Sequence, residues 1–200
     1  MNHFEVFGLE RRLGIDAADL QRKFHELSRR YHPDFHQAAP PDEQARVLEA
    51  SARVNAAYRA LRDPIARVDY LVRLEEGRDT AAADGQREDK PKAPPALLAE
   101  MFEIQEALQE ARTGGLDDAT RATLTEQRAE LAERFAAEEA RITGPLSAAW
   151  DDAPAAERAG VLAKFKDALA RRAYLRTVID DLTEALEGAT EGTDVAHRRH

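Results

Sequence analysis

The sequence predicts an all-helical protein with two domains. Apolar residues recur at helical spacing along most of the 200 residues, and no stretch alternates as a half-buried strand would. Residues 75–96 are rich in Gly, Asp, Lys and Pro without an apolar anchor, which is typical of a linker. The charge balance also changes there. Residues 1–76 hold 12 basic and 13 acidic side chains, whereas the remainder holds 17 and 25.

The N-terminal half is predicted to form four helices. A short one covers residues 3–9, and the next begins after Asp16, a plausible N-cap, and must end before Pro33. A third begins at Pro41 and ends at Asp63-Pro64, where a shorter fourth helix follows. The apolar positions expected to face the core are Leu20, Phe24, Leu27 and Tyr31 in the second helix, Leu48, Val54, Tyr58 and Leu61 in the third, and Ile65, Val68, Leu71 and Val72 in the fourth.

The C-terminal half is predicted to form a three-helix bundle, because short Gly-containing turns separate long amphipathic segments. These segments cover residues 97–112, 117–142 and 154–187. Residues 188–200 have no apolar period and are expected to be disordered. The predicted organisation is therefore an N-terminal domain over residues 1–76, a linker over 77–96, the bundle over 97–187 and a tail over 188–200.

Composition excludes several classes of function. A net charge of −9 argues against nucleic-acid binding, which needs a basic surface. The absence of cysteine excludes disulfides and thiolate sites. No apolar run approaches the roughly 18 residues of a membrane span, and the first residues lack a signal-peptide pattern, so we expect a cytoplasmic protein without a membrane partner. No nucleophile motif, phosphate loop or HExxH is present, so we expect neither an enzyme nor a cofactor.

The tripeptide His32-Pro33-Asp34 has three interpretations. It can be a plain turn, since Pro-Asp pairs are frequent turn formers. It can contribute, with His36, to a metal site, although the other histidines show no second ligand pair. It can also be a docking loop, because the preceding helix carries a basic face and Asp34 is suited to accept a partner's Arg. The residues of that face are Arg22, His25 and Arg29 at i, i+3 and i+7, flanked by Lys23 and Arg30.

The segments FHELSRRYHPDF and ASARVNAAYRALRDPIARVDYL together resemble a J-domain. That resemblance implies a helical hairpin whose His-Pro-Asp loop stimulates ATP hydrolysis by a DnaK-class chaperone. It assigns chaperone binding to the loop and to the basic helix that precedes it. By position, the chaperone-binding residues are His32, Pro33, Asp34, Arg22, Lys23, His25, Arg29 and Arg30.

Nearly the whole chain, over about residues 3–187, is similar to the HscB-type co-chaperones of iron–sulfur cluster assembly. The segments that carry this are HFEVFGLERRLGID, RDPIARVDYLVRL and the C-terminal helices. The resemblance implies two partners, a DnaK-class chaperone of the HscA type and the iron–sulfur scaffold protein. The chain departs from the family where Phe35-His36 replaces the common basic residue followed by Phe.

The segment PPALLAEMFEIQEALQEA has two apolar stripes. One contains Met101 and Ile104, and the second contains Leu98 and Phe102 about 100° further round the helix. From the residues alone, the second stripe is either part of a wide buried face or an exposed patch with an acidic rim. The resemblance implies the second, with scaffold-binding residues Leu98, Phe102, Glu103, Glu106 and Tyr174.

The sequence thus predicts a co-chaperone that brings the scaffold to the chaperone and has no catalytic or metal-binding residue of its own. Three alternatives remain open. The client of the J-domain can be a different protein, the chain can be a metal-dependent enzyme that uses His32, Asp34 and His36, or it can be a purely structural adaptor.

Overall fold

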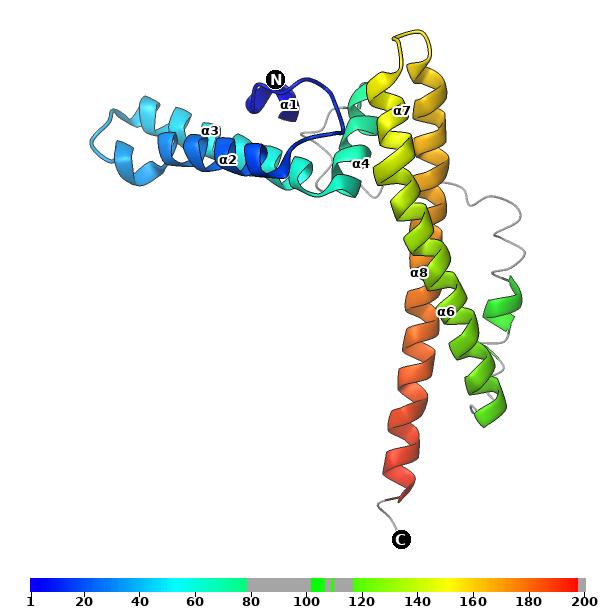
Figure 1. The fold of residues 1–200 in the computed structure, drawn as a ribbon. Helices are drawn as coiled ribbons and strands as arrows, with labels where there is room; N and C mark the ends of the chain where they lie inside the picture. The colour runs from blue at the N-terminus through cyan, green and yellow to red at the C-terminus, as the bar shows by residue number, and fades with distance from the viewer. Residues whose placement is uncertain (79–101, 107–108, 110–116, 198–200) are drawn as a thin grey trace. The chain divides into compact units, whose positions relative to one another are not determined.

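The computed structural model describes residues 1–78, 102–106, 109 and 117–197, with side chains as far as residue 187. Within these ranges every regular element is a helix, as the sequence predicts (Figure 1). The chain divides into two compact units, one of Met1–Arg87 with Ile142–Phe165 and the other of Glu88–Arg141 with Lys166–His200. The first unit therefore joins the N-terminal helices to a segment that the sequence assigned to the bundle.

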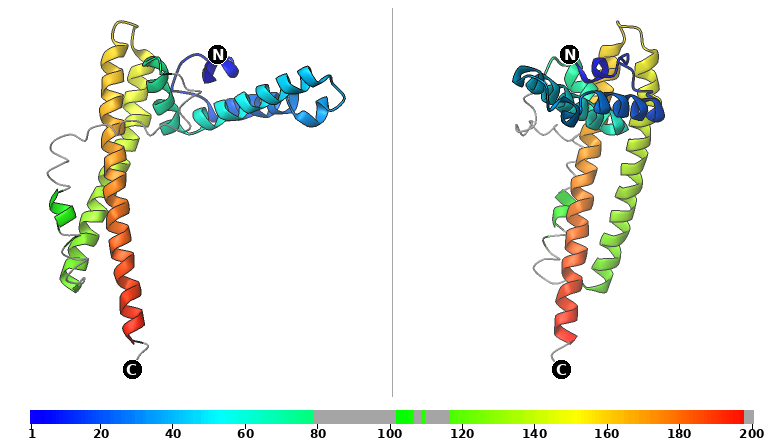
Figure 2. Two further views of the ribbon diagram at one scale, coloured as in Figure 1. Left: turned by 180° about the vertical axis from the view of Figure 1, so that it is seen from behind. Right: turned by 90° about the vertical axis from the view of Figure 1, so that its left-hand side faces the viewer.

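The first unit is built around a helical hairpin. Helix α2 (Ala17–Arg30) and helix α3 (Pro41–Arg62) run antiparallel and side by side in every view (Figures 1 and 2). The 3₁₀ turn η1 (Pro33–His36) lies in the loop between them. The short helix α1 (His3–Val6) packs on α3, and helix α4 (Pro64–Glu75) follows α3 after a sharp turn.

Local signals set the starts of these helices. Asn2 and Glu5 form a reciprocal capping box at the start of α1. The Asp16 carboxylate accepts hydrogen bonds from the backbone N–H groups of Ala18 and Asp19, which confirms it as the N-cap of α2. Asp63 caps α4 in the same way, and α3 begins at Pro41 as predicted.

The core of the hairpin differs from the prediction at one position. Leu20, Val54 and Leu61 are buried as expected, but Leu48 is 63% exposed and Val47 is buried in its place. Leu48 and Val54 are six positions apart, which places them about 240° apart around the helix. Val47 and Val54 are seven positions apart, which returns them to the same face. The prediction for Leu48 was wrong because its phase does not match the rest of the stripe.

The helical path does not end at Gly144-Pro145 as the sequence predicted. A π turn, η2 (Ile142–Leu146), carries it directly into helix α7 (Ser147–Asp152). The Ser147 hydroxyl donates a hydrogen bond of 2.7 Å to the Ile142 carbonyl, which supplies a donor in a turn where Pro145 has no N–H. Trp150 on α7 is buried against Phe165, and its indole N–H points to the Arg11 carbonyl at 3.4 Å.

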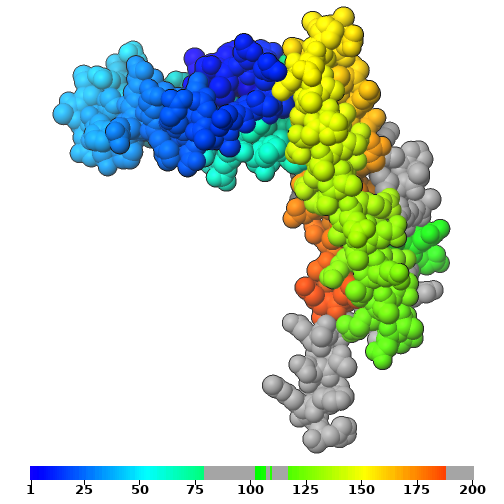
Figure 3. All heavy atoms as spheres, viewed as in Figure 1, coloured from blue at the N-terminus to red at the C-terminus, as the bar shows by residue number. Residues whose placement is uncertain are grey.

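The second unit contains helix α6 (Asp118–Arg141), the part of helix α8 (Arg158–His197) from Lys166 onward, and a helical segment at residues 102–106. Helices α6 and α8 lie side by side in Figures 1 to 3. The core of this unit combines Leu124 and Leu131 of α6 with Leu175, Val178, Leu182 and Leu186 of α8, and it includes Ile104. Ile104 thus contributes a third element to the bundle core, while most of the predicted helix over residues 97–112 lies outside the described residues.

Ion pairs tie α6 to α8 beside this core. A carboxylate oxygen of Glu138 lies 3.3 Å from Nε of Arg171, and one of Glu139 lies 2.7 Å from Nη2 of Arg172. Glu138 also pairs within α6 with Arg141, at 2.6 Å. Burial alone would raise the pKa of Glu138, but its hydrogen bonds and charge contacts with the two arginines outweigh this and lower it. The Glu138 carboxylate therefore stays ionised beside the two arginines.

Helix α8 continues to His197, whereas the sequence placed its end at residue 187 and a disordered tail beyond it. The apolar period stops at Leu186, but residues 188–197 contain no proline to interrupt the backbone. In the described part of the chain, no helix is both long enough and apolar enough to span a bilayer.

Candidate functional site

The His32-Pro33-Asp34 tripeptide forms an exposed turn at the end of the hairpin. His32 is the N-cap of η1, where its Nδ1 accepts a hydrogen bond of 3.3 Å from the Asp34 backbone N–H. The side chains of His32 and Asp34 are 52% and 72% exposed, and His32 Nδ1 lies 3.6 Å from Oδ2 of Asp34. The His32 ring also meets the Phe35 ring edge to face at 5.7 Å. The turn therefore holds the carboxylate of Asp34 outward, open to a partner.

Two side chains hold this loop onto the helices. His36 Nε2 donates a hydrogen bond of 3.0 Å to the Arg30 carbonyl at the end of α2. The Gln44 side chain, on the first turn of α3, donates to the carbonyls of Gln37 at 3.0 Å and Ala39 at 2.8 Å. Sequence analysis did not identify Gln44, because nothing in the local pattern marks a side chain that reaches back to a preceding loop.

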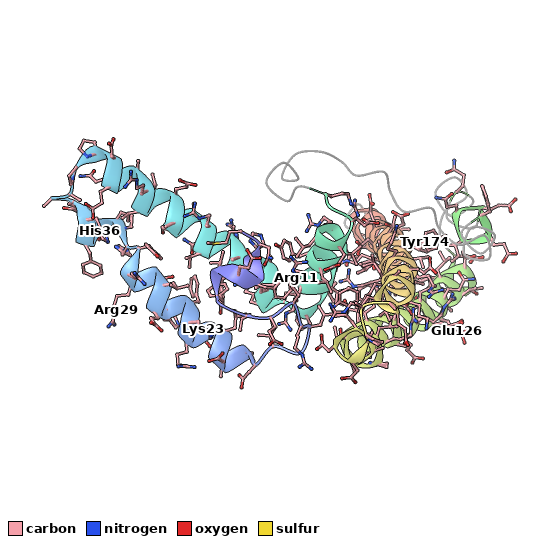
Figure 4. All side chains as sticks on the ribbon, turned by 90° about the horizontal axis from the view of Figure 1, so that it is seen from above. Arg11, Lys23, Arg29, His36, Glu126 and Tyr174 are labelled. Carbon is pink, nitrogen blue, oxygen red and sulfur yellow. The ribbon has the colours of Figure 1, made fainter. Side chains whose placement is uncertain are left out.

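The basic face of α2 leads into this loop. Arg29 lies on the side of α2 away from α3, and His36 lies in the loop at the end of the hairpin (Figure 4). Arg22, His25, Arg29 and Arg30 are all exposed, although Arg22 forms an ion pair with Asp19. Lys23 differs, because its ammonium group donates to the Phe7 carbonyl at 3.1 Å. The predicted chaperone-binding residues are therefore exposed, except for Lys23, which is partly buried and engaged in the fold.

The three residues of the alternative metal site do not converge. His32 and Asp34 are neighbours, but the Nε2 atom of His36 is used by the Arg30 carbonyl and its Nδ1 atom lies 4.0 Å from Glu43. Across the described ranges, no group of three or more His, Asp or Glu side chains is placed to hold a metal ion. The arrangement fits a docking loop better than a metal centre.

The predicted scaffold patch is partly described. Phe102 is 71% exposed, and Glu103 and Glu106 on the same short helical segment are exposed as well. Ile104 between them is buried, so this segment presents one side to the core and the other to solvent. Tyr174 is half-buried and packs against the core cluster of the unit, and Leu98 lies outside the described residues.

Comparison with known proteins relates the chain to one family. Residues 2–70 match the DnaJ domain. The chain is 39% identical over 132 residues to the co-chaperone protein HscB homologue of Bordetella petrii, covering 66% of this chain and 71% of the relative. It is 30% identical over 185 residues to the HscB homologue of Ralstonia nicotianae, covering 92% of this chain and 94% of the relative. The human co-chaperone HscB structure shares the fold, with a TM-score of 0.58 at 22% identity over 92% of this chain and 81% of that one. The chain belongs to the HscB family of J-domain co-chaperones.

Proposed function

We propose that this protein binds the scaffold protein of iron–sulfur cluster assembly and presents it to a DnaK-class chaperone, whose ATP hydrolysis it stimulates. The observation that carries this proposal is the exposed carboxylate of Asp34, held on a braced turn at the end of a basic helix face. An Arg of the chaperone and the Asp34 carboxylate can form a charge-assisted pair, and the basic face suits an acidic surface beside it.

The protein supplies no chemical step of its own in this proposal. Residues 1–76 act on the chaperone, and residues 97–187 hold the scaffold through Phe102, Glu103 and Glu106, with Leu98 and Tyr174 as further contacts. Binding both partners raises the effective concentration of the scaffold at the chaperone, so a modest affinity for each partner suffices. ATP hydrolysis then traps the scaffold on the chaperone and favours cluster transfer to acceptor proteins.

Steady-state ATP hydrolysis by a DnaK-class chaperone tests the first half. We expect Asp34→Asn to abolish stimulation, because the amide loses the charge that an Arg of the chaperone would pair with. Asp42→Asn is the matched control, since it removes an exposed carboxylate from the first turn of α3 and leaves the loop unchanged. Normal stimulation by the Asp34→Asn protein would refute the role of this loop.

Titration of the scaffold protein into the same assay tests the second half. The wild-type protein and the scaffold together should stimulate hydrolysis more than the sum of their separate effects. Phe102→Ala should weaken scaffold binding about tenfold, since it removes an exposed aromatic anchor, whereas Gln105→Ala on the same segment should not. Stimulation by the protein alone, without any scaffold effect, would instead favour a J-domain co-chaperone with a different client.

A further inference from the structure

Large apolar side chains exposed to solvent are concentrated at particular places in this protein. In the described part of the chain they are Met1, Phe35, Leu48 and Phe102. Met1 is the first residue, and Phe102 belongs to the proposed scaffold patch. Phe35 and Leu48 both lie near the loop end of the hairpin, where they are 71% and 63% exposed. An apolar side chain that the fold leaves in water beside a binding loop points to a partner that covers it.

Leu48 borders a hollow of about 400 Å³ between η1 and the first two turns of α3. The residues that line it are Pro33, Asp34, His36, Gln37, Pro41, Gln44, Ala45, Val47 and Leu48. Figure 3 shows that the loop end of the hairpin lies away from α1 and α4. The hollow therefore belongs to the same end of the hairpin as the docking loop and shares Pro33 and Asp34 with it.

The chemistry of the lining is mainly apolar with one available charge. Two polar side chains of the lining are already engaged, His36 with the Arg30 carbonyl and Gln44 with the carbonyls of Gln37 and Ala39. Asp34 remains 72% exposed, and Leu48 and Val47 supply the apolar wall. A group that fits the hollow is thus an apolar side chain, and a basic side chain next to it would meet Asp34.

We propose that this hollow is a second contact for the DnaK-class chaperone and receives an apolar side chain that stands next to a basic one. The proposal rests on the proposed function, because it takes the docking loop as the chaperone's binding site. Since Pro33 and Asp34 belong to both surfaces, a protein bound at the loop covers the hollow as well. Leu48 then contributes to affinity and partner choice, whereas Asp34 is needed for the stimulation itself.

A second copy of this chain is a poorer occupant. Its exposed apolar residue in the second unit, Phe102, is flanked by Glu103 and Glu106, and these carboxylates would be brought against Asp34. The charge pattern therefore favours a basic segment of the chaperone over self-association.

The test is a titration of chaperone ATPase stimulation with wild-type protein and three variants. Leu48→Gln keeps the approximate size but removes the apolar contact, so we expect the half-maximal concentration to rise about tenfold while maximal stimulation is retained. Leu48→Met should restore a near wild-type curve, because it remains apolar. Arg59→Gln, on the same helix face but about 16 Å further along α3, should match wild type.

The two proposals fail in different ways. If wild-type protein does not stimulate the chaperone, the proposed function fails. If wild-type protein stimulates it, Asp34→Asn does not, and Leu48→Gln titrates like wild type, the contact at the hollow is refuted while the proposed function stands. A change in sedimentation of the isolated Leu48→Gln protein, without any change in the titration, would assign the hollow to self-association and refute the inference.

Discussion

At the scale of single residues, the basic face of α2 contains side chains with different duties. Arg29 is exposed and free to meet a partner surface, whereas Lys23 already donates to the Phe7 carbonyl and lies 3.9 Å from Asp19. A Lys that bonds the carbonyl of a preceding turn fixes that turn against the helix. Loss of Lys23 would therefore disturb both the fold and the docking surface, which makes Arg29 the cleaner probe of docking.

The stability of the first unit should depend on pH through His3. The His3 ring stacks on Tyr70 at 4.3 Å, and the His3 backbone N–H donates to the Tyr70 hydroxyl at 2.8 Å. Burial, together with the positive charge of Arg73 on α4, lowers the pKa of His3 below its ordinary value of 6.5. The unfolded chain thus binds a proton more readily than the folded one. The contribution of neutral His3 to the free energy of unfolding is therefore fully present above about pH 6.5. It is lost as the pH drops through the lowered pKa.

Urea denaturation at about pH 5 and about pH 7.5 measures this dependence. His3→Phe keeps an aromatic ring against Tyr70 without a titrating group, so the difference in unfolding free energy between the two pH values should shrink. Glu5 on the same helix and Arg73 on α4 remain in place and contribute equally in both proteins. His25→Gln, at an exposed position on α2, is the control. An equal pH dependence in the wild-type and His3→Phe proteins would contradict the role of His3.

At the scale of elements, the sequence predicted what local chemistry decides. Asp16 was predicted as an N-cap because a short carboxylate reaches the free N–H groups of the next turn. The predicted break at Asp63-Pro64 and the start of α3 at Pro41 rest on the equally local chemistry of proline. Leu48 was misplaced because several apolar residues on α3 offered more than one stripe. Helix α7 was missed because Gly144-Pro145 indicates a stop, and only the tertiary packing of Trp150 shows that the chain continues as a helix.

The docking loop should depend on the Gln44 side chain on α3. Gln44→Glu has the same shape but cannot donate to the carbonyls of Gln37 and Ala39, and it places a negative charge beside them. We expect faster hydrogen exchange at the loop amides and a several-fold loss of chaperone stimulation at low concentration, because the loop is less preorganised.

Gln37→Glu provides the matched control for the exchange measurement. It introduces the same charge into the same loop, but Gln37 takes part in the contact with Gln44 only through its backbone carbonyl. Exchange rates that rise equally in both variants would show that charge, rather than the lost donor, loosens the loop.

At the scale of the whole molecule, the first unit is assembled from segments far apart in the sequence. The buried guanidinium of Arg67 donates to the carbonyls of Leu61 and Leu13. Burial lowers the pKa of Arg67, while the nearby carboxylates of Asp63 and Asp151 oppose that shift. The Leu13 carbonyl is thus bound by α4, and the Leu13 backbone N–H donates to Asp151 on α7. No local sequence pattern predicts this joint, because Leu13 and Asp151 are 138 positions apart and Leu13 takes part through its backbone.

Asp151 on α7 should therefore stabilise the first unit. Its two carboxylate oxygens accept hydrogen bonds of 2.7 Å from the backbone N–H groups of Leu13 and Gly14, and its side chain is only 8% exposed. Asp151→Ala leaves both amides without this acceptor and should lower the unfolding free energy by about 2 kcal/mol, measured by urea denaturation. Asp152→Ala removes the exposed neighbouring carboxylate and should change it by less than about 0.5 kcal/mol. If the two variants are equally stable, the carboxylate of Asp151 does not hold the N-terminal segment to α7. If only Asp151→Ala is destabilised, a segment of the C-terminal half is part of the structural support of the hairpin formed by α2 and α3.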